Sequence, residues 1–249
     1  GGKNMSKINR RNFLSAFGAM SAGLALSQNS NAQTRTGNVN ILTDEEKAQK
    51  LIQASRQRLR DLYFPNVELL THEGKKVRFY DDLIKDKIVT INFMYATCDG
   101  ICSTISRNLA LAQEMLGDMV GKDVFMYSIT LKPVQDTVEV LNAHARAMKA
   151  KPGWLFLTGK PEDIELIRRK QGFVDLDPKV DKDKSQHTGN VRYGNEPMQY
   201  WGSCPGLGDP EVIVESLIWV DESLKEKYLA RKERKKGGYG QGTKKGGGK

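Results

Sequence analysis

Runs of β-forming apolar residues alternate with helix-like spacing through the middle of the chain. Almost continuous apolar runs, as expected of strands buried on both faces, cover residues 87–95, 123–130 and 154–158. Apolar residues three and four positions apart predict helices over residues 102–116, 135–150 and 161–171. Strands that alternate with helices of this length predict an α/β fold in which neighbouring strands run parallel.

Further elements are predicted on either side of this core. Thr43 and Glu46 have the spacing of a capping box, which predicts a polar helix that runs to about residue 62. A polar turn between two short apolar runs predicts a hairpin over residues 67–79. Residues 187–193 alternate as an edge strand should, and Asp209 is placed to cap a final helix. The complete pattern predicts a central mixed sheet flanked by helices.

The first 32 residues have the pattern of an export signal. Arg10 and Arg11 precede an apolar stretch over residues 13–27, and the small residues around Ala32 suit cleavage by signal peptidase. Paired arginines before a mildly apolar run are typical of twin-arginine export. The stretch is shorter than the roughly 20 residues that span a bilayer comfortably. We therefore expect an exported protein, in the periplasm or at the outer face of the cytoplasmic membrane.

The rest of the chain divides by composition into three parts. We expect a linker and polar helix over residues 33–62, a folded domain over 63–222, and a basic tail rich in Gly and Lys over 223–249. The tail has almost no apolar side chains beyond Arg231, so it cannot bury enough surface to offset the entropy of ordering, and we expect it to be disordered. A solubilising role is the favoured interpretation, and contact of the tail or leader with a membrane surface is the alternative.

The net charge of +9 comes from the two ends of the chain. Residues 1–32 carry +4 and residues 231–249 carry +7, which leaves −2 for the body between them. A protein that binds nucleic acid through its folded domain concentrates basic residues there. The charge distribution therefore argues against a nucleic-acid partner.

Two cysteines lie where the most apolar predicted strand gives way to a helix. Cys98 and Cys102 are separated by three residues, and Gly100 between them allows a sharp bend. Unpaired backbone N–H groups at a helix N-terminus stabilise a thiolate, and residues four apart at that position can project toward one point. A structural disulfide this short would gain little from loop entropy. The spacing favours a functional pair that holds a metal or forms a redox disulfide.

Residues 89–102, a hydrophobic strand followed by C-x3-C, resemble the Sco/SenC family of copper-binding thioredoxin-fold proteins. The resemblance continues through residues 127–133 and 152–159 and covers roughly residues 65–220. In that family two cysteines and a distant histidine bind copper, and the protein serves assembly of the copper site of cytochrome oxidase. The resemblance implies a thioredoxin-like fold, with Cys98, Cys102 and His187 as ligands of Cu(I) or Cu(II).

The chemistry of this donor set agrees with copper. Soft thiolates favour Cu(I), and one imidazole completes a three-coordinate site or supports Cu(II) with a further ligand. Zinc is disfavoured because three protein donors suit neither a closed structural site nor an evident hydrolase. The implied partner is a respiratory oxidase subunit or another protein that receives copper.

Two other functions remain open at this point. In a thiol–disulfide oxidoreductase, Cys98 and Cys102 would exchange with a substrate disulfide, His187 would be a nearby base, and a thioredoxin-like reductant would be a partner. In a thioredoxin-fold adaptor, the two cysteines would form a structural disulfide. Metal content separates the copper carrier from both alternatives.

The remaining histidines and the third cysteine are weaker candidates for a site. We expect His72 to be exposed in a polar turn, and His144 to be solvated or to cap a helix. Cys204 could serve as a resolving thiol or a substitute ligand, but a buried thiol is the favoured interpretation.

Overall fold

The computed structural model describes residues 43–97, 101–183 and 189–238. The predicted leader, Cys98, His187 and the last residues of the tail lie outside these ranges. No helix in the described ranges is both long enough and apolar enough to cross a membrane.

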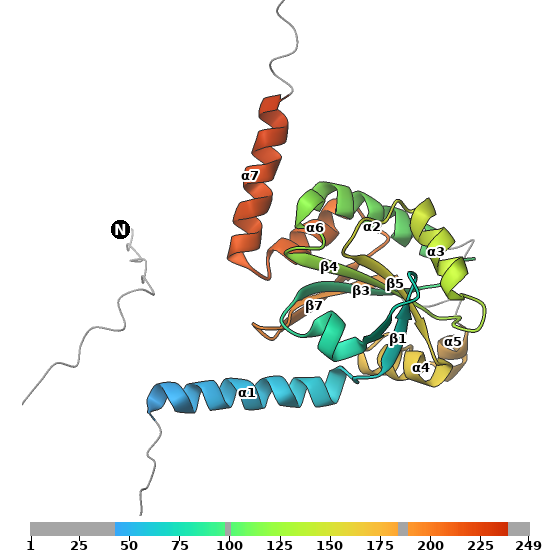
Figure 1. Cartoon of the computed structure of the whole chain (residues 1–249), viewed down its shortest axis with the longest axis horizontal. Coiled ribbons are helices and arrows are strands. Elements are labelled where there is room, and N and C mark those ends of the chain that lie inside the picture. The colour runs from blue at the N-terminus through green and yellow to red at the C-terminus, as the bar shows by residue number, and fades with distance from the viewer. Residues whose placement is uncertain (1–42, 98–100, 184–188, 239–249) are drawn as a thin grey trace, which may run out of the picture. The chain divides into compact units, whose positions relative to one another are not determined.

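The elements follow in the order α1 (Asp44–Tyr63), β1 (Glu68–Thr71), β2 (Lys76–Arg78), a π-helical turn η1 (Phe79–Ile84), β3 (Ile88–Met94), α2 (Ile101–Leu116), a 3₁₀ turn η2 (Gly117–Met119), β4 (Val124–Thr130), α3 (Val138–Ala147), β5 (Trp154–Gly159), α4 (Pro161–Lys170), α5 (Pro178–Lys182), β6 (Asn190–Asn195), β7 (Tyr200–Pro205), α6 (Pro210–Ile218) and α7 (Glu222–Gly238) (Figure 1).

The strands form one mixed sheet in the order β2-β1-β5-β4-β3-β6-β7. Strands β3, β4 and β5 are parallel neighbours, whereas the other adjacent pairs are antiparallel. In Figure 1, α2, α3 and α6 cover one face of the sheet, and α4 and α5 lie on the opposite side. The predicted α/β class and the central mixed sheet with flanking helices are confirmed.

Strand β3 lies inside the sheet and carries the chain into the cysteine motif. It pairs in parallel with β4, with Ile91 opposite Tyr127, and antiparallel with β6, with Ile91 opposite Arg192. Every residue from Val89 to Met94 is buried, because helices cover both faces of the strand. The long apolar run in the sequence therefore becomes a rigid strand that ends at the motif.

The prediction of an edge strand over residues 187–193 was wrong in its position. The strand that forms, β6, is flanked by β3 and β7, and β7 is the strand at this edge of the sheet. Sequence analysis did not predict β7 because Gly202 and Pro205 are unfavourable in strands. A strand beside β6 is nevertheless stable because Trp201 packs on Phe64, with ring centroids 4.6 Å apart.

The N-terminal helix α1 forms where the sequence predicts it. The Thr43 side chain accepts the Glu46 N–H, and the Glu46 carboxylate accepts the Thr43 N–H, which completes the capping box. No side chain of α1 is buried, so packing contributes little to its position. Arg56 instead forms an ion pair with Glu196, which also accepts the Tyr80 hydroxyl at 2.9 Å. This charged contact joins α1 to the hairpin between β6 and β7.

The segment from residue 223 onward differs from the disordered tail that composition predicts. It forms α7 through Gly238, and Leu224 and Tyr228 are buried in the core. These two apolar residues are four apart, so they share one helix face. Lys227 pairs with Asp123 at 2.5 Å on the same side of the domain. The low apolar content of the segment did not indicate that Leu224 and Tyr228 alone form an apolar face that docks the helix on the domain.

Candidate functional site

Cys102 lies in the first turn of α2, shortly after the carboxyl end of β3. Its side chain is 2% exposed and belongs to the hydrophobic core together with Ile105 and Leu109. A thiol in the first turn of a 16-residue helix is close to backbone N–H groups that have no intrahelical partner and that favour negative charge. Cys98 lies outside the described residues, so the geometry of the pair stays a prediction.

The segment that contains His187 also lies outside the described residues, but the chain that follows it is placed. The carbonyl of Gly189 accepts the N–H of Gly206 at 2.7 Å. A Cβ atom on Gly189 would lie 3.6 Å from Cδ1 of Ile105, one turn beyond Cys102 in α2. The chain therefore returns to the sheet, two residues after His187, against the first turns of the helix that carries Cys102.

The loop between β4 and α3 contacts three successive residues that lead into the motif. Leu131 donates its N–H to the carbonyl of Met94 at 2.7 Å. The Lys132 ammonium lies 3.7 Å from the centre of the Tyr95 ring, a cation–π contact. The Asp136 carboxylate accepts the N–H of Ala96 at 3.0 Å.

Sequence analysis did not single out Lys132 or Asp136 as site residues. An acidic residue before a helix ordinarily reads as part of the helix N-terminus, and Thr137 does cap α3. The contacts of Asp136 with Ala96 join residues 40 positions apart, and no local pattern predicts such a pair. The only sequence feature that could have indicated this contact is that the two segments follow the carboxyl ends of β3 and β4, which are adjacent parallel strands.

Cys204 is a buried thiol on β7, as the favoured interpretation expected. Its Sγ lies 3.6 Å from the carbonyl oxygen of Val191, and 5% of the residue is exposed. Burial raises the pKa of the Cys204 thiol, and a hydrogen bond with Ser216 opposes this shift. A thiol kept protonated and enclosed is a poor nucleophile and a poor metal ligand.

Sequence analysis expects His72 to be exposed and His144 to be solvated or to cap a helix, but both side chains are half-buried. Both rings pack edge-on against Phe156, with centroids 5.9 Å and 5.2 Å away. His72 Nδ1 accepts the N–H of Phe156 at 3.2 Å, because the hairpin turn folds back against β5. Burial lowers the pKa of each ring, so both favour the neutral form. Both rings pack on β5, and the charge of Asp136 partly opposes the lowering of the His144 pKa. No described contact joins either ring to Cys102.

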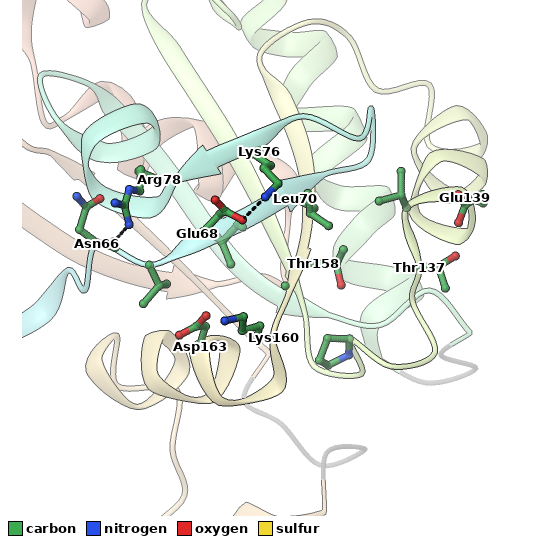
Figure 2. Close-up of a pocket in the computed structure, with 15 residues that line it drawn as sticks. Asn66, Glu68, Leu70, Lys76, Arg78, Thr137, Glu139, Thr158, Lys160 and Asp163 are labelled. Atoms are coloured by element: carbon green, nitrogen blue, oxygen red, sulfur yellow. Dashed lines mark hydrogen bonds and ion pairs between the residues drawn. The ribbon is translucent and has the colours of Figure 1, made fainter.

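An open groove of about 870 Å³ lies between the β1–β2 hairpin and the first turns of α3 and α4 (Figure 2). Three acidic and three basic side chains line it, and Lys76 pairs with Glu68 across the hairpin at 3.0 Å. Pro133 and Thr137 line the groove from the loop that also contacts Ala96. The lining contains no thiol or imidazole, so the groove offers no soft ligand for copper.

Comparison with known proteins identifies the family. The SCO1/SenC family model matches residues 55–220, which is about two thirds of the chain. The chain therefore belongs to the SCO1/SenC family. The Sco/SenC resemblance in the sequence is confirmed. No curated protein matches the chain.

Several solved structures from bacteria and yeast share the fold of this chain. Yeast Sco1 is 21% identical with a TM-score of 0.51, and the match covers 66% of this chain and 98% of that one. A SCO1/SenC family lipoprotein from Bacillus anthracis is 22% identical with a TM-score of 0.51, over 62% and 92%. ScoI from Bradyrhizobium japonicum, solved with copper bound, is 20% identical with a TM-score of 0.50, over 62% and 96%. At these identities the matches establish the thioredoxin-like fold of the chain.

Proposed function

We propose that this protein is a copper-binding assembly factor that delivers copper to the copper site of a respiratory oxidase, or prepares that site. Membership of the SCO1/SenC family over residues 55–220 carries the proposal. Family members have been solved with copper bound, and one solved relative is described as belonging to a family of cytochrome c oxidase assembly proteins. The partner would be an oxidase subunit or another protein that receives copper.

The donor set that we propose is Cys98, Cys102 and His187. Two thiolates and one imidazole suit copper in both common oxidation states, since thiolates favour Cu(I) and the imidazole supports Cu(II). Copper is the cargo of such a carrier, so the site must take up and release the metal. Cys102 is buried beside Ile105 in α2, which fixes one donor on a rigid helix.

A thiol–disulfide oxidoreductase is the second candidate, and the position of Cys102 at the start of α2 favours it. One thiolate of the pair would attack a substrate disulfide, forming a mixed disulfide and releasing one substrate thiolate. The other would attack that mixed disulfide, releasing the second substrate thiolate and leaving Cys98 and Cys102 joined. The substrate gains two electrons, and a thioredoxin-like reductant would restore the protein dithiol.

We also propose that the protein acts outside the cytoplasm. The paired arginines and apolar run within residues 1–32 support export by the twin-arginine route. Whether the leader is cleaved before Gln33 or kept as an anchor decides whether the protein is released into the periplasm. Mass spectrometry of the N-terminus of the exported protein distinguishes the two forms.

Metal analysis after reconstitution tests the proposed function. The reduced full chain, incubated with Cu(I) or Cu(II) and passed through a desalting column, is expected to retain copper in an equimolar amount. Cys102→Ser is expected to retain far less, because it removes a thiolate, whereas Cys204→Ser is the matched control outside the donor set. Equal copper in the wild type and Cys102→Ser would contradict the ligand assignment.

A further inference from the structure

Asp136 is a buried carboxylate that lies against the backbone leading to Cys98. It is 1% exposed, although it belongs to the loop between β4 and α3. Its Oδ2 accepts two hydrogen bonds, from the N–H of Ala96 at 3.0 Å and from the hydroxyl of Thr130 at 2.5 Å. Ala96 precedes Cys98 by two residues, so the carboxylate holds the last described part of the chain before the motif.

This arrangement is costly, and packing alone does not explain it. Asp136 Oδ1 is buried and has no hydrogen-bond partner. Burying a carboxylate is unfavourable unless it is well paired, and an apolar side chain of similar size would avoid that cost. A buried polar atom left without a partner calls for a specific explanation. The explanation that fits the geometry is the hydrogen bond to Ala96, which only an acceptor at this position can make.

The loop itself is held firmly, so it can act as a fixed support. Lys132 donates its N–H to Thr130 Oγ1 at 2.9 Å, and Asp136 donates its N–H to the Lys132 carbonyl at 2.9 Å. Thr137 caps α3 immediately afterwards. Together with the contacts to Met94 and Tyr95, these bonds tie the chain before the motif to the end of β4 at three successive residues.

We propose that Asp136 is a positioning residue that fixes the backbone at Ala96 and thereby places Cys98 relative to Cys102. Cys102 is buried in α2, and Ala96 precedes Cys98 by two residues, so fixing the backbone at Ala96 limits where Cys98 can lie relative to Cys102. The inference rests on the proposed role of the two cysteines as a working pair. A pair held close together has a high effective concentration of one thiol for the other, which favours both a disulfide and a shared metal ion.

The disulfide equilibrium of the metal-free full chain tests this inference. In glutathione buffers the two protein thiols reduce oxidised glutathione, giving the Cys98–Cys102 disulfide and two molecules of reduced glutathione. Alkylation of the remaining thiols and mass spectrometry give the oxidised fraction of this pair. Asp136→Ala is expected to lower the equilibrium constant about tenfold, which is about 30 mV for this two-electron couple. Asp136→Asn keeps an amide oxygen for Ala96 and is expected to stay close to the wild type.

Two further variants separate positioning from general stability. Ser128→Ala removes a buried hydroxyl of β4 that bonds Asn92 and Trp154 and does not contact Ala96, so it is the matched control. Thr130→Val removes the hydroxyl donor to Asp136 and also the acceptor for the Lys132 N–H, and it replaces Asp136→Ala if that variant does not fold. It is expected to shift the equilibrium in the same direction by a smaller factor.

The inference is overturned if Asp136→Ala and Thr130→Val both keep the wild-type equilibrium, or if Ser128→Ala shifts it equally. Because this measurement uses no metal, its outcome is independent of copper binding. A protein that retains no copper but depends on Asp136 for its disulfide equilibrium would contradict the copper proposal and support the positioning role.

Discussion

Asp181 fastens the short helix α5, which ends five residues before His187. Its carboxylate forms a two-pronged ion pair with the Arg168 guanidinium, with N–O distances of 2.6 Å and 2.8 Å. Arg168 is 4% exposed, and Asp181 is only slightly more accessible, so solvent screens this pair weakly. Both carboxylates around Arg168 raise the pKa of the guanidinium further above its ordinary value. Replacing Asp181 with Ala would leave a buried cation with one of its two carboxylate partners removed.

The expected loss of stability follows from this burial. Breaking a buried ion pair by removing one partner costs about 3–5 kcal/mol. Glu165 still contacts Arg168 at 2.8 Å in the Asp181→Ala variant, so we expect the lower end, about 3 kcal/mol. At about 2–4 °C per kcal/mol for a chain of this size, Tm is expected to fall by about 6–12 °C. Thermal unfolding and urea denaturation measure the two quantities.

Arg169 provides the matched control, because it contacts the same carboxylate from the surface. It is 59% exposed and lies 3.4 Å from Asp181, so Arg169→Ala is expected to cost less than about 1 kcal/mol. The double variant Arg168→Met, Asp181→Leu removes both charges and is expected to recover most of the loss. Equal losses in Asp181→Ala and Arg169→Ala would refute the argument that burial sets the strength of this pair.

Three further predictions follow from the described residues. Burial lowers the pKa of His72 in the folded protein below the ordinary value of 6.5. The neutral ring therefore contributes its full share to the free energy of unfolding above pH 6.5, and this share is lost as pH falls through the lower pKa of the folded state. His72→Asn keeps an acceptor for the Phe156 N–H but has no group that titrates in this range. Between about pH 7.5 and about pH 5, its free energy of unfolding in urea should therefore fall less than that of the wild type. The same pH dependence in both proteins would count against this prediction. Truncation after Gly238 should leave Tm unchanged, whereas truncation after Asp221 should lower it. The second truncation removes Leu224 and Tyr228, which each contribute about 1.5–3 kcal/mol by burial. Equal Tm values for the two truncated proteins would show that α7 does not stabilise the domain. Iodoacetamide should label Cys98 faster than Cys102 in the reduced protein, because Cys102 is 2% exposed. Equal rates by mass spectrometry would contradict the prediction that Cys98 is the more exposed thiol.

Most of the fold could be predicted because its strands are long, apolar and bounded by helices. The run that became β3 shows burial on both faces directly in its composition, and the capping box at Thr43 marks a helix start without tertiary information. Strand β7 could not be predicted, since its stability comes from pairing with β6 and from Trp201 on Phe64. Helix α7 could not be predicted for the same reason, because its stability depends on a tertiary contact: Leu224 is buried only when the helix docks on the domain.

The candidate site was predictable only where its chemistry lies in a local motif. Cys102 could be placed at a helix start because the change from apolar strand to helical spacing is visible in the sequence. Asp136 could not be identified, because its burial and its bond to Ala96 depend on two parallel strands ending side by side. His72 and His144 were misjudged for a related reason, since neither the polar turn around His72 nor the alanines beside His144 gave a sign that both rings pack on Phe156.

Copper binding through His187 is the central claim, and a titration of the reduced full chain tests it most directly. Cu(II) is added to the wild type, to His187→Ala and to the control His72→Asn, and thiolate-to-Cu(II) absorption is recorded. We expect the wild type and the control to bind with an intense band, and His187→Ala to bind Cu(II) far more weakly while it loses less affinity for Cu(I). A His187→Ala protein with the full Cu(II) affinity and an unchanged band, or a wild type that binds no copper, would contradict the account.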